Sequence, residues 1–493
     1  MTDKTRLGVS LMAVGLLGGA LGDALLRATP LGVNLFVWIA ALIASVTAVL
    51  ILNRVESDTG RKRLVIPLLL FAAAVAWRDS PVLKALNLVG VAITLGMVLM
   101  RSGSVKLLAA GVTDYAYSVL ASLFSALGGA GHLIGDDIQW KEIPRDGWTK
   151  HLTPVIKGLA IAVPLLLIFG GLLASADAAF SNLMFRLFDW DFESLVAHFL
   201  LTIIIAWAVA GFLRGVVAGK ETAVMRAVRP QSLWLGVTET AIVLGLLDIL
   251  FLSFVVVQFR YFFGGAARIQ AVAGLTYAEY ARSGFFELVG VAALVLPLLL
   301  AAHWLLRKEK ARDERVFRVL AGAQIALLFV MMVSALRRMR LYQREYGLTE
   351  LRVYTTVFMG WLAVVFIWFA MTVLRGRRER FAFGAVATGF LAIGALLALN
   401  PDRLIARVNV EHAIAGRAFD AAYAASLSAD AVPELIEALP NLNGAQRCAL
   451  ASQILQNKPI GQSPGWRRWN WSRAEAARRL VASERELRGS ACR

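Results

Sequence analysis

Residues 381–399 read FAFGAVATGFLAIGALLAL, and none of these nineteen side chains carries a charge. The hydrocarbon core of a bilayer is about 30 Å thick, and a helix needs about 20 apolar residues to cross it. Inside lipid, a helix also satisfies its backbone hydrogen bonds within its own segment. The stretch therefore predicts a membrane-spanning helix.

Similar stretches occur along most of the preceding chain. We predict eleven spans, at residues 7–24, 33–52, 64–77, 82–100, 155–173, 195–213, 236–257, 285–306, 317–336, 353–374 and 381–399. The third is short, and it either tilts little or pairs with the fourth as a helical hairpin. The first resembles a signal peptide, but we predict an uncleaved span because many hydrophobic segments follow it.

The composition also indicates a membrane protein. Of 493 residues, 58% are hydrophobic and 17% are charged, whereas a soluble globular chain is about 45–50% apolar and about 25% charged. A formal charge of +17 would suggest nucleic acid as the partner of a soluble protein. In a membrane protein basic residues gather in cytoplasmic loops, so we predict a lipid bilayer and no nucleic acid as the partner.

The distribution of Lys and Arg predicts the orientation. With the N-terminus in the cytoplasm, 25 basic residues fall on the cytoplasmic side and 12 on the opposite side. Basic loops are retained in the cytoplasm during insertion. We therefore predict a cytoplasmic N-terminus and a C-terminus in the periplasm or outside the cell.

Residues 107–127 are also apolar enough to span, but they contain Asp114, Tyr115, Tyr117 and four Ser or Thr residues. If they crossed the membrane, the basic residues would divide as 17 inside and 20 outside, against the usual bias. We therefore predict an interfacial or re-entrant helix.

From residue 400 onward no segment is long enough to span, and short helices are expected between proline-containing breaks. The run WRRWNW at 466–471 has two interpretations: packing inside a small helical domain, or docking at lipid headgroups, where Trp and Arg are both favourable. Cys448 and Cys492 lie far apart and lack zinc spacing, so we expect neither a disulfide framework nor a structural zinc site.

The predicted fold class is all-α: a polytopic helical membrane protein with about eleven transmembrane helices and a small C-terminal helical domain. Residues 1–100 supply four N-terminal transmembrane helices, and residues 101–154 the interfacial or re-entrant helix and its loop. Residues 155–399 form a seven-helix membrane core, and residues 400–493 form a soluble domain outside the cytoplasm.

Four blocks, in order along the chain, resemble one family. They are YFFGG at 261–265, LTYAEYAR at 275–282 with GFFEL at 284–288, LYQ at 341–343 with YGLT at 346–349, and NPD at 400–402 through LSADAVP at 427–433. They resemble a family of bacterial multi-pass membrane proteins, domain of unknown function 4173, over about residues 155–440. The resemblance implies a bacterial cytoplasmic (inner) membrane, and it carries no activity and no catalytic residue.

Several of these blocks share the outer face in the predicted topology. We predict a candidate outer-face site from Tyr277, Glu279, Tyr280, Arg282, Glu287, Arg337, Arg340, Tyr342, Tyr346 and Arg352. Residues 337–352 also place five arginines in an outside loop, against the positive-inside rule. Two interpretations stay open: a salt-bridge network that holds loops together, or recognition of an anionic ligand, lipid headgroup or carbohydrate.

Asp248 is unusual because it lies near the middle of its span. A carboxylate there costs about 2.5–3.5 kcal/mol on insertion scales and usually faces the bundle interior. Asp248 is either protonated or hydrogen-bonded to polar groups such as Gln324 or Thr202. It is a candidate intramembrane proton site, or a residue that supports helix packing.

Motifs of known chemistry are absent from the sequence. There is no His-Glu-x-x-His, no Gly-x-Ser-x-Gly and no Walker motif, so we predict no catalytic residues, no cofactor and no metal. Gly15, Gly18, Gly19 and Gly22 form two Gly-x-x-x-Gly patterns in the first span. These allow close packing within the chain or a homodimer.

Three functional hypotheses follow. The first is a non-enzymatic integral membrane protein that binds a ligand, a lipid or an envelope protein partner on its outer face, in envelope regulation or assembly. The alternative is a proton-coupled secondary transporter that uses Asp248. The third is a membrane-embedded transferase that uses the outer Glu, Arg and Tyr residues.

Overall fold

The computed structural model describes residues 1–55, 59–102, 107–142, 149–177, 180, 192–218, 234–262, 285–307, 310–458 and 465–492. Within these residues the chain is helical and contains no β-strand beyond one isolated bridge.

Every predicted span corresponds to a helix. These helices are α1 (Asp3–Leu26), α2 (Val33–Leu52), α4 (Val65–Trp77), α5 (Pro81–Ser102), α7 (Thr149–Ala176), α9 (Phe192–Ala218), α10 (Val237–Phe262), α13 (Phe285–Leu305), α14 (Ala311–Tyr346), α15 (Glu350–Thr372) and α16 (Phe381–Leu399). A short helix, α3 (Thr59–Arg63), precedes α4. The protein is therefore an all-α, multi-pass membrane protein.

Length and hydropathy together select ten helices of the described residues as long and apolar enough to cross a membrane. Only 17–44% of the residues in their most apolar windows are buried inside the protein. The remaining apolar side chains need lipid to cover them. The ten include α6 (Val112–His132) but neither α4, which has 13 residues, nor α7.

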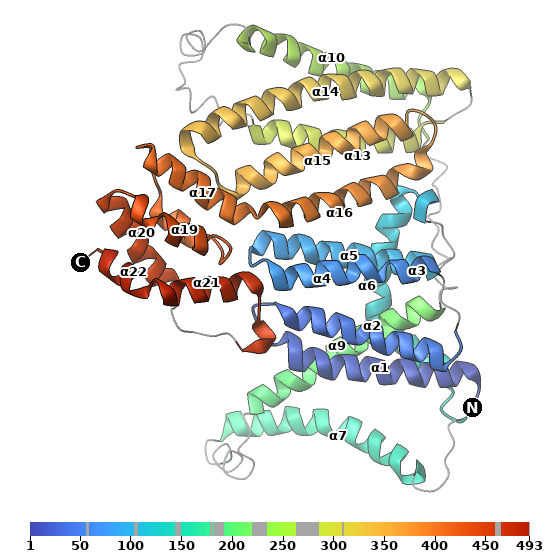
Figure 1. Ribbon diagram of the computed structural model, residues 1–493. Helices are drawn as coiled ribbons and strands as arrows, with labels where there is room; N and C mark the ends of the chain where they lie inside the picture. The colour runs from blue at the N-terminus through green and yellow to red at the C-terminus, as the bar shows by residue number, and fades with distance from the viewer. Residues whose placement is uncertain are drawn as a thin grey trace.

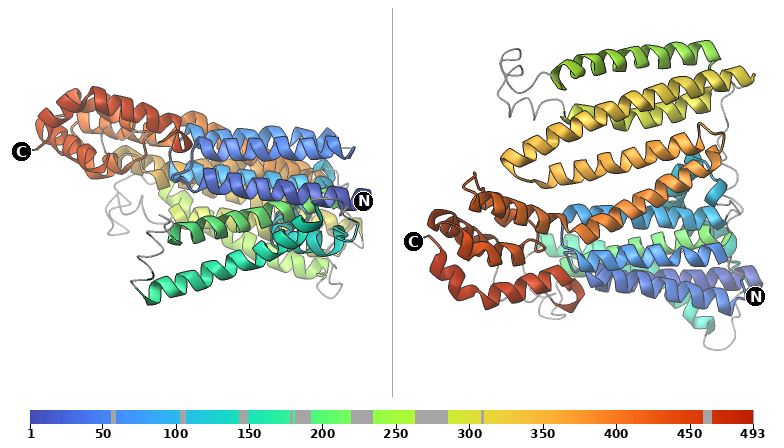
Figure 2. Two further views of the ribbon diagram at one scale, coloured as in Figure 1. Left: turned by 90° about the horizontal axis from the view of Figure 1, so that it is seen from below. Right: turned by 45° about the horizontal axis from the view of Figure 1, so that its top comes forward.

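The spanning helices lie side by side between two ends of the bundle (Figure 1). α1 begins at one end, which we call the first end. The C-terminal domain packs against the opposite end, which we call the docking end (Figure 2). The α1–α2 loop lies at the docking end, where the backbone N–H of Val33 donates to the carbonyl oxygen of Trp469 at 2.9 Å.

α6 runs across the other helices instead of along them (Figure 1). Near its start, Tyr115 packs in one cluster with Leu64, which immediately precedes α4. Its end continues into η2 (Leu133–Asp137), where the carboxylate of Asp137 lies 3.0 Å from Lys4 Nζ. Both ends of α6 therefore lie at the first end of the bundle.

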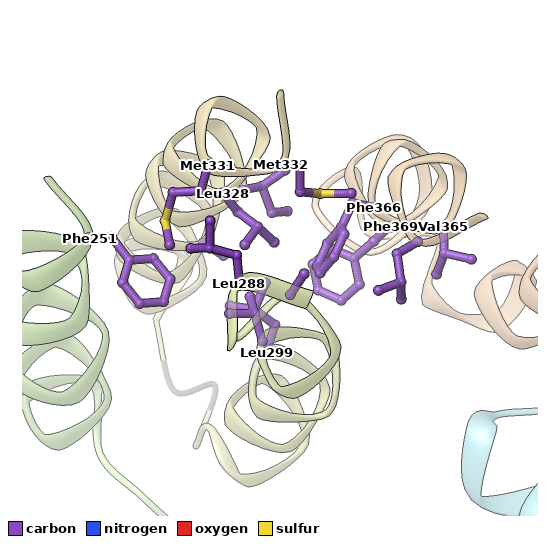
Figure 3. Packing of buried hydrophobic residues seen from close by; sticks show 14 of the residues in the cluster. Phe251, Leu288, Leu299, Leu328, Met331, Met332, Val365, Phe366 and Phe369 are labelled. Atoms are coloured by element: carbon purple, nitrogen blue, oxygen red, sulfur yellow. The ribbon is translucent and has the colours of Figure 1, made fainter. Parts of the chain in front are cut away.

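The largest buried core joins α10, α13, α14 and α15. Figure 3 shows its side chains in the space between these four helices, among them Phe251, Leu288, Leu299, Leu328, Met331 and Phe366. α16 connects this core to the N-terminal helices, because its Phe390 packs edge-on against Phe71 of α4 with ring centroids 4.7 Å apart.

The glycines of the first span lie inside the protein. Gly15, Gly18, Gly19 and Gly22 are all buried. A Cβ on Gly15 or Gly19 would collide with Ala206 or its neighbours on α9, and one on Gly18 would meet α2. These glycines allow close packing within the chain, so the surface on which the predicted homodimer depends is already occupied.

The C-terminal domain contains α17 (Pro401–Ile414), α18 (Ala421–Ser426), α19 (Val432–Ala438), α20 (Gly444–Asn457), α21 (Trp471–Ala482) and α22 (Glu484–Ser490). A disulfide joins Cys448 of α20 to Cys492 just after α22, with the Cα atoms 4.9 Å apart. The expectation of no disulfide is wrong, because α22 turns the chain back onto α20 across 44 residues of sequence.

A buried carboxylate attaches this domain to the bundle. Asp430 accepts the backbone N–H groups of Asp79 (2.7 Å) and Ser80 (3.1 Å), in the turn between α4 and α5. It also accepts the hydroxyl of Ser472 at 2.5 Å and lies 3.5 Å from Arg78 Nη1. One side chain therefore links the α4–α5 turn to two parts of the C-terminal domain.

Candidate functional site

Part of the predicted outer-face site forms one cluster at the α14–α15 turn. The rings of Tyr342 and Tyr346 lie 4.9 Å apart, and the guanidinium of Arg352 lies 4.2 Å from the centre of the Tyr342 ring. Arg352 Nη1 also donates to the carbonyl oxygens of Tyr346 (3.2 Å) and Gly347 (2.7 Å). Gly347 adopts φ +69°, a conformation that favours glycine in this turn.

The C-terminal domain contacts the turn beside this cluster. Asn409 of α17 accepts the backbone N–H of Leu348 at 2.7 Å and donates to the same residue's carbonyl oxygen at 2.9 Å. Glu350 donates its backbone N–H to the hydroxyl of Tyr423 at 2.9 Å. These contacts join the α14–α15 turn to the C-terminal domain.

Arg337 and Arg340 lie on α14, which is helical throughout its 36 residues. The prediction of a loop from residue 337 is therefore wrong up to residue 346. A helix of this length extends for about 54 Å, well beyond a hydrocarbon core of about 30 Å. The last turns of α14 can thus continue past the membrane, where charge is not penalised.

Of the remaining five predicted residues, the structure describes only Glu287. Glu287 lies exposed in the first turn of α13. Tyr277, Glu279, Tyr280 and Arg282 lie outside the described residues, and their participation stays a prediction.

Asp248 lies in α10, which packs against α14. Both of its carboxylate oxygens are enclosed and accept no hydrogen bond from a described residue. The side-chain amide of Gln324, in α14, is likewise buried without a partner among the described residues. The expected hydrogen bond between these two side chains is not formed.

A cavity of about 490 Å³ opens at the docking end, between the end of α1, the start of α9 and the tail around η7 (Trp466–Arg468). The residues that line it are Asp23, Ala24, Arg27, Ala28, Thr29, His198, Gly465, Trp466, Arg467 and Arg468. We call this cavity the interfacial pocket. It contains three arginines, a histidine and an exposed tryptophan, a combination suited to a negatively charged headgroup.

Each arginine of the interfacial pocket is held by an uncharged group. Arg467 Nη1 donates to the carbonyl oxygen of Ala24 at 2.8 Å, and Arg468 Nη1 to that of Thr29 at 3.4 Å. Arg27 Nη2 donates to the hydroxyl of Ser194 at 3.3 Å. Within the described part of the chain, none of these three guanidinium groups forms a salt bridge. Their positive charge remains available to a ligand.

A histidine and an aspartate pair at one wall of the pocket. His198 Nδ1, on α9, lies 2.5 Å from an oxygen of Asp23 on α1. The side chain of His198 is 45% exposed, whereas that of Asp23 is 13% exposed. The imidazole is therefore fixed by a largely buried carboxylate while part of its ring faces the pocket.

The local sequence explains why the tail reaches this position. Asn34 accepts the backbone N–H of Gly32 at 2.7 Å and donates to the carbonyl oxygen of Leu25 at 2.9 Å, which shapes the α1–α2 loop. A Cβ on Gly32 would collide with the carbonyl group of Trp469, so only glycine permits this close approach. The loop and the tail together bring Arg467 and Arg468 to α1.

Three residues of the pocket were not predicted from the sequence: Asp23, Arg27 and His198. A signal was present, because each is a polar residue near the docking end of an otherwise apolar helix. The aromatic and basic run at 466–471 was recognised, but nothing in the sequence indicated that it faces α1. Within the described residues, no group of three or more His, Cys, Asp or Glu side chains could hold a metal ion.

A protein-family model described as "Domain of unknown function (DUF4153)" matches residues 65–438. The matching family therefore carries the number 4153 and not the expected 4173. No curated protein and no solved structure matches the chain. Of the charged pocket residues only His198 lies in the matched range, so the arginines of the pocket lie outside the part of the chain that the family describes.

Proposed function

This chain belongs to the DUF4153 family, and from that premise we propose that it is a bacterial inner-membrane protein that binds an anionic ligand or lipid headgroup in the interfacial pocket. The observation that carries the proposal is the set of three arginines around one cavity without a carboxylate partner among the described residues. Guanidinium groups bind phosphate and carboxylate oxygens through paired N–H donors. The role is non-enzymatic, in envelope regulation or assembly.

The proposed orientation places the first end in the cytoplasm and the docking end outside it. Two observations support this: the excess of basic residues on the predicted cytoplasmic side, and the Cys448–Cys492 disulfide in the C-terminal domain. Disulfides persist in the periplasm and at the cell surface but are rare in the cytosol. The crosswise helix α6 then lies in the cytoplasmic interface of the membrane.

A reporter fusion tests the orientation. Alkaline phosphatase joined after Arg493 should be active, because the enzyme folds only outside the cytoplasm. In intact cells, Cys448 and Cys492 should react with a maleimide only after reduction. An inactive fusion with freely reactive thiols would place the domain in the cytoplasm and contradict the proposal.

Ligand binding is tested with the purified full-length protein in a neutral detergent. Phosphatidylglycerol should raise the midpoint temperature of unfolding, and phosphatidylcholine with the same acyl chains should not. The double variant Arg467→Gln with Arg468→Gln should lose about 2–4 kcal/mol of binding free energy, from two charge-assisted contacts. Arg478→Gln with Arg488→Gln is the matched control, because it removes two exposed charges of the same domain outside the pocket. Equal losses in the two double variants would refute a specific site.

Proton-coupled transport through Asp248 is a second candidate function. A buried carboxylate without a hydrogen-bond donor in the described residues is the observation in its favour. Proton uptake by reconstituted vesicles that disappears in Asp248→Asn would support it. Uptake that continues in this variant would remove Asp248 from any transport mechanism.

A further inference from the structure

We infer that the interfacial pocket selects phosphate monoesters, and that the pairing of His198 with Asp23 makes this selection. The inference rests on the proposed anion binding and adds to it the chemical class of the ligand. Asp23, Arg27, His198, Arg467 and Arg468 carry it, all of them lining one cavity.

The contact with Asp23 fixes the imidazole of His198. Because the carboxylate of Asp23 can only accept, the 2.5 Å contact assigns the proton to His198 Nδ1. The other nitrogen, Nε2, makes no hydrogen bond to a described residue, and the side chain of His198 is 45% exposed. An imidazole fixed in this way by a carboxylate presents Nε2 in a defined direction, as in metal sites and catalytic dyads.

The second oxygen of Asp23 strengthens this arrangement. Oδ1 is buried and has no hydrogen-bond partner among the described residues. With a proton on Nε2 as well, His198 can donate on both sides of its ring, to Asp23 and to a ligand. A ligand oxygen that accepts from Nε2 would therefore complete a chain from phosphate through His198 to Asp23.

The interfacial pocket has a positive formal charge. Three arginines and one aspartate give the pocket a formal charge of +2, which becomes +3 when His198 is protonated. A phosphate monoester carries about −1.5 to −2 at neutral pH and offers three terminal oxygens. A phosphodiester or a carboxylate carries a single negative charge and has fewer acceptor oxygens. Of these three groups, the monoester has the charge closest to that of the pocket with opposite sign and the most oxygens for its donors.

The three arginines of the pocket are already held in position. Each guanidinium makes the single contact to Ser194, Ala24 or Thr29 described above, which fixes it in place. Its other N–H groups donate to no acceptor among the described residues. Pre-positioned donors lose little entropy when they bind a ligand.

Two sources of this chemistry are possible: a lipid with a terminal phosphate, or a soluble phosphate ester. Leu17 and Leu21 are exposed on α1 below the pocket, so acyl chains could lie along this helix. Both sources share the monoester group, and the experiment distinguishes them.

The test compares two anionic lipids with identical acyl chains, phosphatidic acid (a monoester) and phosphatidylglycerol (a diester), bound to the full-length protein in neutral detergent. The wild type should bind phosphatidic acid about tenfold more tightly, the effect of one additional charge-assisted hydrogen bond. His198→Asn should abolish this preference, because the amide can keep the contact to Asp23 while Nε2 is lost. An unfolding temperature close to that of the wild type shows that the variant is folded.

His132→Asn is the matched control, because His132 forms a similar contact with Asp136 at 2.8 Å on the exposed surface of the first end. It should keep the wild-type preference. Equal affinity of the wild type for the two lipids would overturn the inference while the proposed anion binding stands. Loss of all anion dependence, or insensitivity to the Arg467 and Arg468 substitutions, would refute the proposed function itself.

Competition identifies the source of the ligand. Glycerol phosphate that displaces phosphatidic acid at similar concentration supports a soluble monoester. Displacement only by lipids supports a membrane headgroup. Displacement by phosphatidylglycerol as effectively as by phosphatidic acid would contradict the selection of monoesters.

Discussion

Asp430 joins the C-terminal domain to the membrane bundle through contacts with both. It is buried, and its donors include the backbone N–H groups of Asp79 and Ser80 in the α4–α5 turn. Removing one partner of a buried charged network typically costs about 3–5 kcal/mol. Asp430→Ala should therefore lower the free energy of unfolding by about this amount and speed proteolysis of the C-terminal domain.

The comparison for this prediction is Glu475→Ala. Glu475 forms exposed pairs with Arg478 and Arg479, and exposed pairs contribute about 0–1 kcal/mol. Thermal unfolding and limited proteolysis of the two variants measure the difference. Similar behaviour of the two would show that Asp430 does not hold the domain in place.

Asp402 should make the stability of the folded protein depend on pH. Burial raises the pKa of Asp402 from 3.8 to about 6; the hydrogen bond from Ser428 opposes the shift, and the charges of Glu350 and Asp430 add to it. Because the folded state binds this proton more tightly than the unfolded chain, the contribution to stability is full below about pH 4 and is lost as the pH rises through about 6. The difference amounts to about 3 kcal/mol.

Asp402→Asn should therefore be more stable than the wild type above about pH 6 and should lose this pH dependence. Unfolding midpoints measured between about pH 4 and pH 8 test this prediction. Asp420→Asn, at the exposed start of α18, should keep the wild-type pH profile. A wild type whose stability does not fall over this range would contradict the assignment.

The pocket residues show the limit of prediction from single positions. Asp23 and His198 are separated by 175 positions and meet only because α1 packs along α9. Asp248 was recognisable because a charge in the middle of a span is costly. A polar residue at the end of a span is common. The sequence alone therefore does not distinguish a residue that binds a ligand from one that contacts lipid headgroups.

The structure makes a testable prediction about the topology of α6. Its composition permits a span, but its two ends contact the same end of the bundle. Single cysteines at Thr113 and Gly135 should therefore react with a membrane-impermeant maleimide from the same side of the membrane. Ser426→Cys, in the C-terminal domain, should react from the other side. Labelling of Thr113→Cys and Gly135→Cys from opposite sides would show that α6 spans.

The contact between α1 and α9 depends on glycine. A Cβ on Gly19 would collide with the backbone of α9, so Gly19→Leu should lower the stability by about 1–3 kcal/mol through forced separation of the helices. Gly245→Leu, in α10, is the control, because nothing lies within 4 Å of an added Cβ there. Unfolding temperatures in detergent measure both. A Gly19 variant as stable as the control would mean that the two helices do not pack this closely.

The sequence predicts where the apolar helices lie along the chain better than it predicts where each helix ends. Each of the eleven predicted segments falls on a helix, because the cost of exposing a charge to lipid acts on local composition. The extension of α14 beyond residue 336 was missed, because Arg337 to Arg344 resemble a loop by charge although arginine is a good helix former.

For the whole molecule, the change of composition at residue 400 predicts membrane helices followed by a small C-terminal helical domain. The contacts between these parts were not predictable. Asp430 with Asp79, and Arg467 with Ala24, join segments more than 350 and 440 positions apart. Local composition contains no information on such pairs, and the disulfide was missed for the same reason.

The two walls of the interfacial pocket are made at very different times. Arg467 and Ala24 are separated by 443 positions, so a ribosome completes one wall early in translation and the other only after the last membrane helix has been inserted. A chain arrested before its tail folds can contain every membrane helix and still lack the binding site. Ligand occupancy would therefore distinguish finished molecules from incomplete ones.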